Sequence, residues 1–98
     1  MSVSKLQAQV TAARLRLADS TAELGTVLGL LGEHTEAEQL LRQAVAIYES
    51  SCGPDDLRLA APLTSLDAAC AAKGRLAEAE RLCRRALRIF NEEAEERR

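Results

Sequence analysis

Apolar and polar residues recur at helical spacing along nearly the whole chain. In the first third, apolar or small residues return every three or four positions, at Leu6, Val10, Ala13, Leu17, Thr21, Leu24, Leu28 and Leu31. This period is typical of a helix with one apolar face, and it predicts one long helix over residues 4–31. The alternative is a break near Asp19, followed by a new helix with Ser20 and Glu23 as its capping box. We favour continuity because the stripe keeps its phase across Asp19.

Two glycines lie inside this predicted helix. Gly25 and Gly29 would each cost the helix about 1 kcal/mol relative to alanine. We therefore expect another segment of the chain to approach the helix closely at these positions.

A glycine and a capping motif separate the first helix from the second. Gly32 suits the left-handed residue that ends a helix, and Thr35 with Glu38 forms a T-x-x-E capping box. A second helix is predicted over residues 36–50, and its inward stripe is Ala37, Leu40, Leu41, Ala44, Val45 and Tyr48. Because the connection is short, we expect the two helices to be antiparallel.

The third predicted helix, residues 57–73, follows a turn that reads Cys52-Gly-Pro-Asp-Asp56. Asp56 suits the N-cap, and the apolar stripe is Leu59, Leu63, Leu66 and Cys70. Pro62 interrupts this helix, at a cost of ~3 kcal/mol in mid-helix but almost none in a first turn. Because the stripe keeps its phase through Pro62, we expect a kinked helix from Leu57 rather than a new start at Ala61.

The fourth predicted helix covers residues 76–93, after a second glycine cap at Gly74. Its inward stripe is predicted to be Ala79, Leu82, Cys83, Ala86, Leu87 and Phe90. The last residues are almost all charged, and we expect 94–98 to be a frayed tail.

The second and fourth helices are near-copies of each other, 42 residues apart. The stretch from Gly32 to Tyr48 reads GEHTEAEQLLRQAVAIY, and that from Gly74 to Phe90 reads GRLAEAERLCRRALRIF. A fixed period of roughly 20–50 residues indicates a repeat architecture, in which neighbouring units bury each other's apolar faces. We therefore treat residues 1–98 as one domain of repeated helix pairs.

Composition narrows the fold and the class of function. Only 2% of the residues are aromatic, while Leu and Ala, the best helix formers, dominate the apolar set, so the sequence predicts an all-α fold. The net charge is −2 with both signs mixed, which argues against nucleic-acid binding. Because no apolar run approaches the ~20 residues of a membrane span and the start of the chain does not resemble a signal peptide, we expect a cytoplasmic protein without membrane contact.

The residues assembled above resemble the tetratricopeptide repeat, in particular the 42-residue type of kinesin light chains and related bacterial proteins. The resemblance lies in Gly53-Pro-Asp-Asp56 through the LTSL at 63–66, and in the string from Gly74 to Ile89, and it spans residues 20–90. It implies antiparallel helix pairs stacked as a short right-handed superhelix, whose concave face binds a partner protein or peptide. The residues themselves offer no Gly-rich phosphate loop, no paired inward carboxylates and no nucleophile beside a base, so we expect no catalytic residues, cofactor or metal.

The resemblance maps the concave face onto the first helix of each pair. The residues so implied are Asp19, Ala22, Glu23, Thr26, Gly29 and Leu30 from the first unit, then Ala61, Thr64, Ser65, Ala68, Ala71 and Ala72 from the second. The lysines and asparagines with which some relatives hold a peptide carboxylate are missing. A smooth surface of small residues favours a docked helix over an extended peptide. The alternative is that these alanines reflect only their high helix propensity.

The chain also departs from the family pattern. Asp67 stands where the family has a small residue, and Leu28, Leu41, Cys70 and Cys83 stand where it often has aromatics. Because a buried, unpaired carboxylate is costly, we expect the second unit to pack more loosely at Asp67.

Few side chains suggest chemistry. His34, the only histidine, has no cysteine or acid placed as a metal or catalytic partner, so we expect an exposed turn residue. The odd cysteine count without a C-x-x-C motif suits reduced thiols; Cys70 and Cys83 are expected to be buried, and Cys52 exposed.

Three hypotheses follow. The leading one is a non-catalytic module that binds a partner helix or peptide on the concave face. The second is self-association as a homodimer, through the same small apolar surface or the open ends of a stack with fewer than the ~3 repeats that stability usually requires. The third is redox sensing through Cys70 and Cys83.

Overall fold

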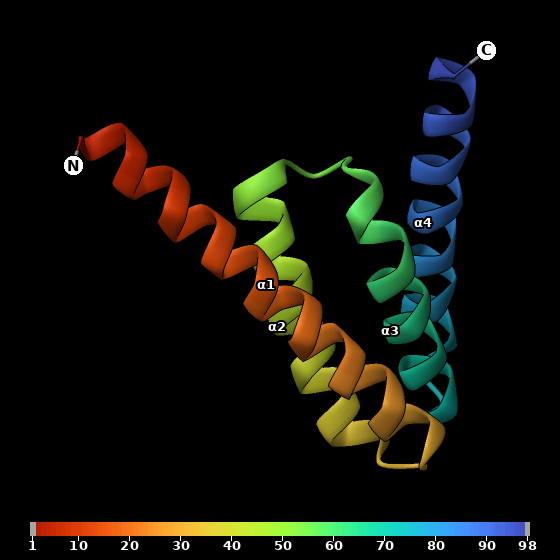
Figure 1. Ribbon diagram of the computed structural model, residues 1–98. Helices are drawn as coiled ribbons and strands as arrows, with labels where there is room; N and C mark the ends of the chain where they lie inside the picture. Colours follow the sequence, from red (N-terminus) through yellow and green to blue (C-terminus); the bar gives the residue numbers. More distant parts are fainter. Residues whose placement is uncertain (1, 98) are drawn as a thin grey trace.

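The computed structural model describes residues 2–97, which form four α-helices and one short 3-10 helix. The elements are α1 (Val3–Leu30), α2 (His34–Cys52), η1 (Leu57–Leu59), α3 (Ala60–Ala72) and α4 (Leu76–Glu96). Figure 1 shows α1 antiparallel to α2 and α3 antiparallel to α4, with the first turns of α1 projecting alone. The all-α prediction and the pairing of helices into hairpins are confirmed.

The long first helix is continuous through Asp19, as predicted. Its N-cap is Ser2, whose side chain accepts a hydrogen bond of 3.2 Å from the Lys5 amide. The face of α1 that packs against α2 is built from small residues, with Ala18 and Gly25 buried. The large apolar stripe faces elsewhere, since Leu17 and Leu24 are 58% and 51% exposed.

The close approach expected at the glycines occurs at Gly25. A Cβ atom built on Gly25 would lie 2.8 Å from Cγ of Leu41, which is itself 1% exposed. At Gly29 the nearest atom is Cβ of Ala37, at an ordinary 3.8 Å. The two helices of the first hairpin therefore touch most closely where Leu41 lies over Gly25.

The two hairpins turn in the same way. Gly32 and Gly74 have φ angles of +88° and +82°, as predicted for C-terminal caps. In each turn the next amide bonds back to a helix carbonyl at 2.9 Å, Glu33 to Leu28 and Arg75 to Cys70. This matching geometry is the structural counterpart of the 42-residue offset.

The predicted capping box of the second helix is wrong. The helix begins at His34, its N-cap is Glu33, and no side chain caps it. Thr35 therefore lies inside the first turn. The carboxylate of Glu38 turns instead to cations on the other hairpin, which provide charged donors that a backbone amide cannot match.

The predicted kinked α-helix from Leu57 is also wrong in its first turn. Residues Leu57–Leu59 form η1, and the α-helix begins at Ala60. Pro62 is thus in the first turn of α3, where its missing N–H costs little. The N-cap prediction at Asp56 is confirmed, since its Oδ1 accepts from the Arg58 amide at 2.9 Å.

The fourth helix is longer than predicted. It continues to Glu96, so residues 94–96 of the expected frayed tail are helical, and the ion pair between Arg97 and Glu93 at 2.7 Å supports the last turn. Of the two other residues of that predicted tail, Arg97 is the C-cap of α4, and Arg98 lies outside the described residues.

The core runs between the hairpins and has two clusters. One comprises Ala18, Ala44, Val45, Tyr48, Leu59, Leu63, Ala86 and Ile89; the other comprises Ala37, Leu41, Leu66, Cys70 and Ala79. Ala44 and Ala86, paired by the repeat, are 0% and 7% exposed. The predicted stripe of α3 is buried throughout, so α3 is the helix that joins the hairpins.

Half of the predicted inward stripe of α4 is wrong. Cys83 is exposed, and Leu87 and Phe90 are 59% and 60% exposed. A helical stripe marks the apolar face, but α4 is the outermost helix and no described segment covers that face. Asp67, at the repeat position of Gly25, is only half-buried, so its carboxylate keeps contact with solvent.

Candidate functional site

The concave side of the molecule is a groove between α1 and α3. The two helices are joined across it by one hydrogen bond, between Thr26 Oγ1 and Ser65 Oγ at 2.8 Å. Thr26 lines a hollow on each side of this bond, and Ser65 lines one of them. This bridge therefore lies between the two hollows of the groove.

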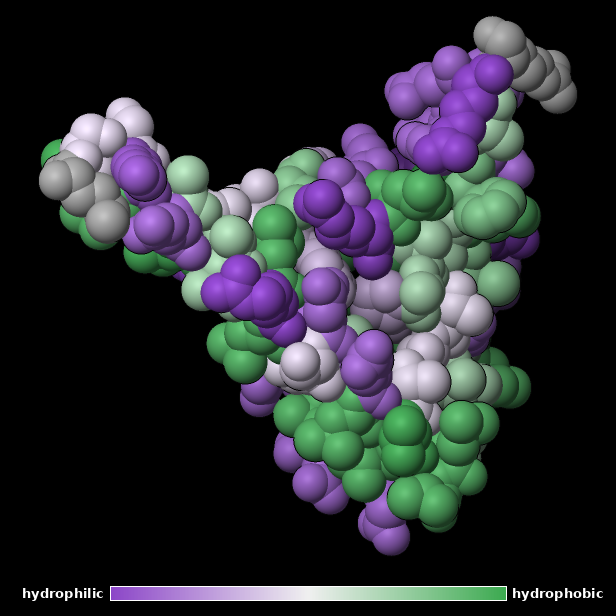
Figure 2. Space-filling view, in the orientation of Figure 1, coloured by the Kyte–Doolittle hydropathy of each residue, from purple (hydrophilic) through white to green (hydrophobic). Residues whose placement is uncertain are grey.

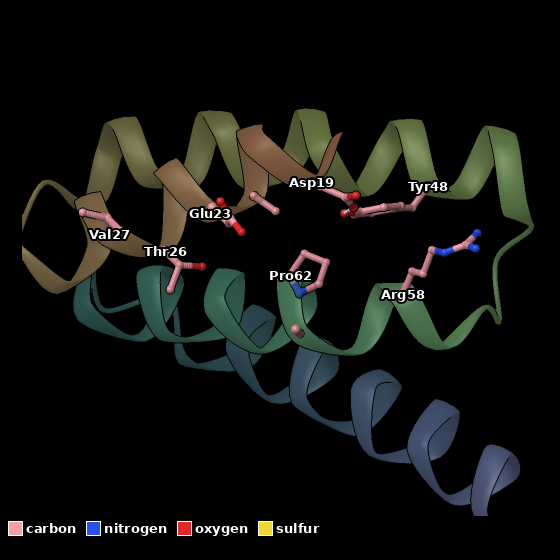
Figure 3. Close-up of a pocket in the computed structure, with 9 residues that line it drawn as sticks. Asp19, Glu23, Thr26, Val27, Tyr48, Arg58 and Pro62 are labelled. Atoms are coloured by element: carbon pink, nitrogen blue, oxygen red, sulfur yellow. Dashed lines mark hydrogen bonds between the residues drawn. The ribbon is translucent and has the colours of Figure 1, made fainter. Parts of the chain in front are cut away.

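The first hollow has a volume of about 640 Å³ and combines an apolar wall with charged groups. Figure 3 shows Asp19 and Glu23 from α1, Tyr48 from α2, and Arg58 and Pro62 from η1 and α3 around it. The full lining is Asp19, Ala22, Glu23, Thr26, Val27, Tyr48, Arg58, Ala61 and Pro62. Its carboxylates would suit a cationic side chain of a bound partner.

A hydrogen bond from Tyr48 fixes one wall of this hollow. The phenol donates to Oδ1 of Asp19, and Figure 3 shows the two side chains pointing toward each other. Burial, and then the bond to Asp19, raises the pKa of Tyr48 well above its usual value, so the phenol stays protonated and remains a donor.

The second hollow is smaller, about 220 Å³, and is lined by small residues. Its lining is Gly25, Thr26, Gly29, Leu30, His34, Thr64, Ser65, Ala68 and Ala69. His34 was expected to be an exposed turn residue, but it opens α2 and is half-buried. Its Nδ1 is buried without a hydrogen-bond partner among the described residues.

The structure brings most of the residues implied by the resemblance into these hollows. The first hollow takes Asp19, Ala22, Glu23, Thr26 and Ala61; the second takes Thr26, Gly29, Leu30, Thr64, Ser65 and Ala68. Ala71 and Ala72 line neither and are exposed at the end of α3. Tyr48 and His34 were missed because α2 contributes to a groove that the resemblance maps onto the first helix of each pair. Arg58 lies within the predicted third helix but was not among the residues that the resemblance implies.

An ion-pair cluster around the buried Glu38 lies between the hairpins, away from the groove. Glu38, 9% exposed, accepts two bonds of 2.8 Å from Arg75 and one of 3.2 Å from Lys73. Arg42 bridges Glu38 and Glu78. The bonds from Arg75 foremost lower the pKa of Glu38 to about 2, so this carboxylate is ionised at neutral pH.

This cluster includes three side chains that resemble metal ligands. Ligand atoms of Glu38, Cys70 and Glu78 lie within 4.8 Å of one another. The carboxylates, however, are already neutralised by Arg42, Lys73 and Arg75, and a divalent ion would have to displace or repel these cations. The donor set fits an ion-pair latch between the hairpins better than a metal.

The three thiols have different environments. Cys70 is 0% exposed, as predicted, and donates to Glu78 Oε1 at 3.3 Å; burial foremost raises its pKa, so it stays a protonated thiol. Cys83 was expected to be buried but is exposed, and Cys52 is half-buried. Cys70 and Cys83 face different surroundings, the inter-hairpin core and an open groove, so the structure gives the redox hypothesis no support.

Comparison with known proteins identifies the family of the chain. Residues 16–92 match the family described as tetratricopeptide repeat. No match was found among curated proteins. Within the described residues, no helix is both long and apolar enough to cross a membrane.

Proposed function

Because the chain belongs to the tetratricopeptide repeat family, a family of protein-interaction modules, we propose that it is a non-catalytic module that binds a partner helix in the groove between α1 and α3. The observation that carries this proposal is the pair of hollows on either side of the Thr26–Ser65 bridge. They share one side of the molecule and are lined by residues from both hairpins.

The lining suggests the chemistry of the partner. The second hollow is small, and its small residues, among them Gly29 and Ala68, allow a helix to approach closely. The first hollow holds Asp19 and Glu23 beside Arg58. The partner proposed is therefore a helix with small side chains at one end of the contact and a lysine or arginine at the other.

A display selection tests this proposal. A library of helical peptides of about 20 residues is selected against the chain, and the enriched peptides are measured against variants. Glu23→Lys should reject peptides with a cation, and Ala68→Arg should block the second hollow. Gln39→Arg, on the exposed face of α2, is the matched control and should bind like the native chain. Equal binding by all the variants would contradict the proposal.

A second candidate function is self-association, as a homodimer or a longer assembly. It is supported by large apolar side chains left exposed on the outermost faces of both hairpins, Leu17 and Leu24 on α1 and Leu87 and Phe90 on α4. Such surface is often an interface in folded proteins. A rise in mass with concentration in sedimentation experiments would support it, and a monomer at all concentrations would contradict it.

A further inference from the structure

The second hairpin carries an open apolar groove, the acceptor groove, between the start of α3 and the middle of α4. It encloses about 720 Å³ and is lined by Leu57, Ala60, Ala61, Thr64, Ser65, Cys83, Ala86, Leu87 and Phe90. Figure 2 shows hydrophobic residues gathered where α3 begins beside α4, below the charged end of α4. The groove is a distinct surface, although Ala61, Thr64 and Ser65 also border the concave side.

The 42-residue offset maps the acceptor groove onto an interface that is buried inside the same molecule. Shifted back by one repeat, the lining becomes Leu15, Ala18, Asp19, Ala22, Glu23, Leu41, Ala44, Val45 and Tyr48. Most of these residues belong to, or pack against, the two core clusters that Leu59, Leu63 and Leu66 complete. In the first hairpin, the equivalent groove is therefore filled by the leucine stripe of the next helical segment, Leu59, Leu63 and Leu66.

The same offset identifies a matching stripe on the opposite end of the molecule. Leu17 and Leu24 of α1 are the repeat equivalents of Leu59 and Leu66. The equivalents in α3 are 0% and 2% exposed, whereas Leu17 and Leu24 are 58% and 51% exposed. We call Leu17, Thr21, Leu24 and Leu28 the donor ridge. The donor ridge is the repeat equivalent of the stripe Leu59, Leu63, Leu66 and Cys70, but no described segment offers it a groove to pack into.

Charges at the ridge and groove are partly complementary. Between the hairpins, Arg42 pairs with Glu78. In a contact between two copies, the equivalent pair would be Arg84 of one copy and Glu36 of the next. The contact of Glu38 with Arg75 becomes a repulsive one of Glu80 with Glu33. Contacts between copies should therefore be weaker than those between hairpins, and reversible.

We propose that a second copy of this chain docks its donor ridge into the acceptor groove and so extends the stack of hairpins head to tail. Groove and ridge are different surfaces at opposite ends of one chain, so the contact is heterologous and each copy can bind two others in an open row. The inference rests on self-association, the second proposed function, and does not require binding in the concave groove, although the two grooves share Ala61, Thr64 and Ser65.

Sedimentation velocity over a concentration series tests the two faces separately. Phe90→Arg should disable the groove and Leu17→Arg the ridge, each weakening association roughly tenfold or more because a charge is buried. Both residues are more than half exposed in the monomer, and circular dichroism checks that the variants fold. Gln39→Arg is the control, since Gln39 and its repeat equivalent, Arg81, are both exposed and line neither groove.

Mixing the variants gives the decisive result. Phe90→Arg keeps an intact ridge and Leu17→Arg an intact groove, so their mixture should form a 1:1 dimer that grows no further. In the same way, Arg84→Glu should weaken association and Glu36→Arg should restore it when the two are mixed. A mixture of the arginine variants that stays monomeric, while the native chain dimerises, would overturn the head-to-tail contact but leave self-association standing. A native chain that is monomeric at every concentration would overturn both.

Discussion

Leu41 lies so close to Gly25 that a single methyl group at residue 25 would collide with it, at 2.8 Å from Leu41 Cγ. Leu41 is 1% exposed and belongs to the cluster with Leu66 and Cys70. Because the core around it is filled, Leu41 cannot move aside cheaply. The contact explains why a residue of poor helix propensity stands in the middle of α1.

Gly25→Ala should therefore destabilise the protein, although alanine is the better helix former. Overpacking costs about 1–3 kcal/mol, against a gain of about 1 kcal/mol in propensity, so we expect a net loss of up to ~2 kcal/mol. Urea denaturation monitored by circular dichroism measures the change. Gly29→Ala is the matched control, because its Cβ would meet only Ala37 Cβ at 3.8 Å, and it should stabilise by up to ~1 kcal/mol. Equal effects of the two variants would contradict the close approach.

Glu38→Gln should weaken the attachment of one hairpin to the other. The substitution leaves Arg75, Lys73 and Arg42 without their shared carboxylate, and we expect a loss of ~1–3 kcal/mol in the free energy of unfolding. Glu80→Gln is the control from the equivalent repeat position, since Glu80 is 63% exposed and pairs only with Arg84. The control should change stability by less than ~0.5 kcal/mol. Denaturant titration compares the two variants, and a loss as large for Glu80→Gln would count against the latch.

The free energy of unfolding should depend on pH through the protonation of Glu38. Its pKa falls from 4.5 in the unfolded reference to about 2 in the fold, chiefly through the bonds from Arg75. The ionised carboxylate therefore stabilises the fold fully above pH 4.5, and this contribution is lost as the pH falls toward 2. The difference in unfolding free energy between the native chain and Glu38→Gln should shrink over this interval. A difference that is constant with pH would contradict the assignment.

The three cysteines should react in the order of their exposure. A thiol reagent under native conditions should modify Cys83 first and Cys52 more slowly. Cys70 should react only on unfolding, because it is 0% exposed and its pKa is raised by burial. Mass spectrometry of digested, labelled protein gives the order. Rapid labelling of Cys70 in the folded chain would contradict the position given to α3.

Much of the fold could be predicted from the sequence because the information was local and repeated. The steps of three and four residues gave the helices, and Gly32 and Gly74 gave the turns, since a positive φ at the end of a helix favours glycine. The predicted capping box was wrong because the spacing of Glu38 fits a capping box, whereas its carboxylate binds Arg75 in the folded chain. Arg75 is distant in the sequence, so the local pattern could not indicate this ion pair.

The other differences between prediction and structure concern which apolar faces are covered by another helix. The stripes of α1 and α4 are apolar, yet Leu24 and Phe90 are exposed because they lie on the outer faces of the two hairpins. Periodicity reports that a face is apolar, and it carries no information on the partner of that face. In the same way, Tyr48 and Arg58 entered the concave groove through tertiary packing, which no spacing in the sequence indicates.

The central claim is that the groove between α1 and α3 is the binding surface. Backbone amide chemical shifts of the labelled protein, measured while a selected helical peptide is added, test this most directly. The claim predicts shifts that concentrate at Ala22, Glu23, Thr26, Thr64, Ser65 and Ala68, with little change at Gln39 or Arg81 on the outer helices. Shifts that instead cluster on the outer faces of α2 and α4, with the residues beside the Thr26–Ser65 bridge unmoved, would contradict it.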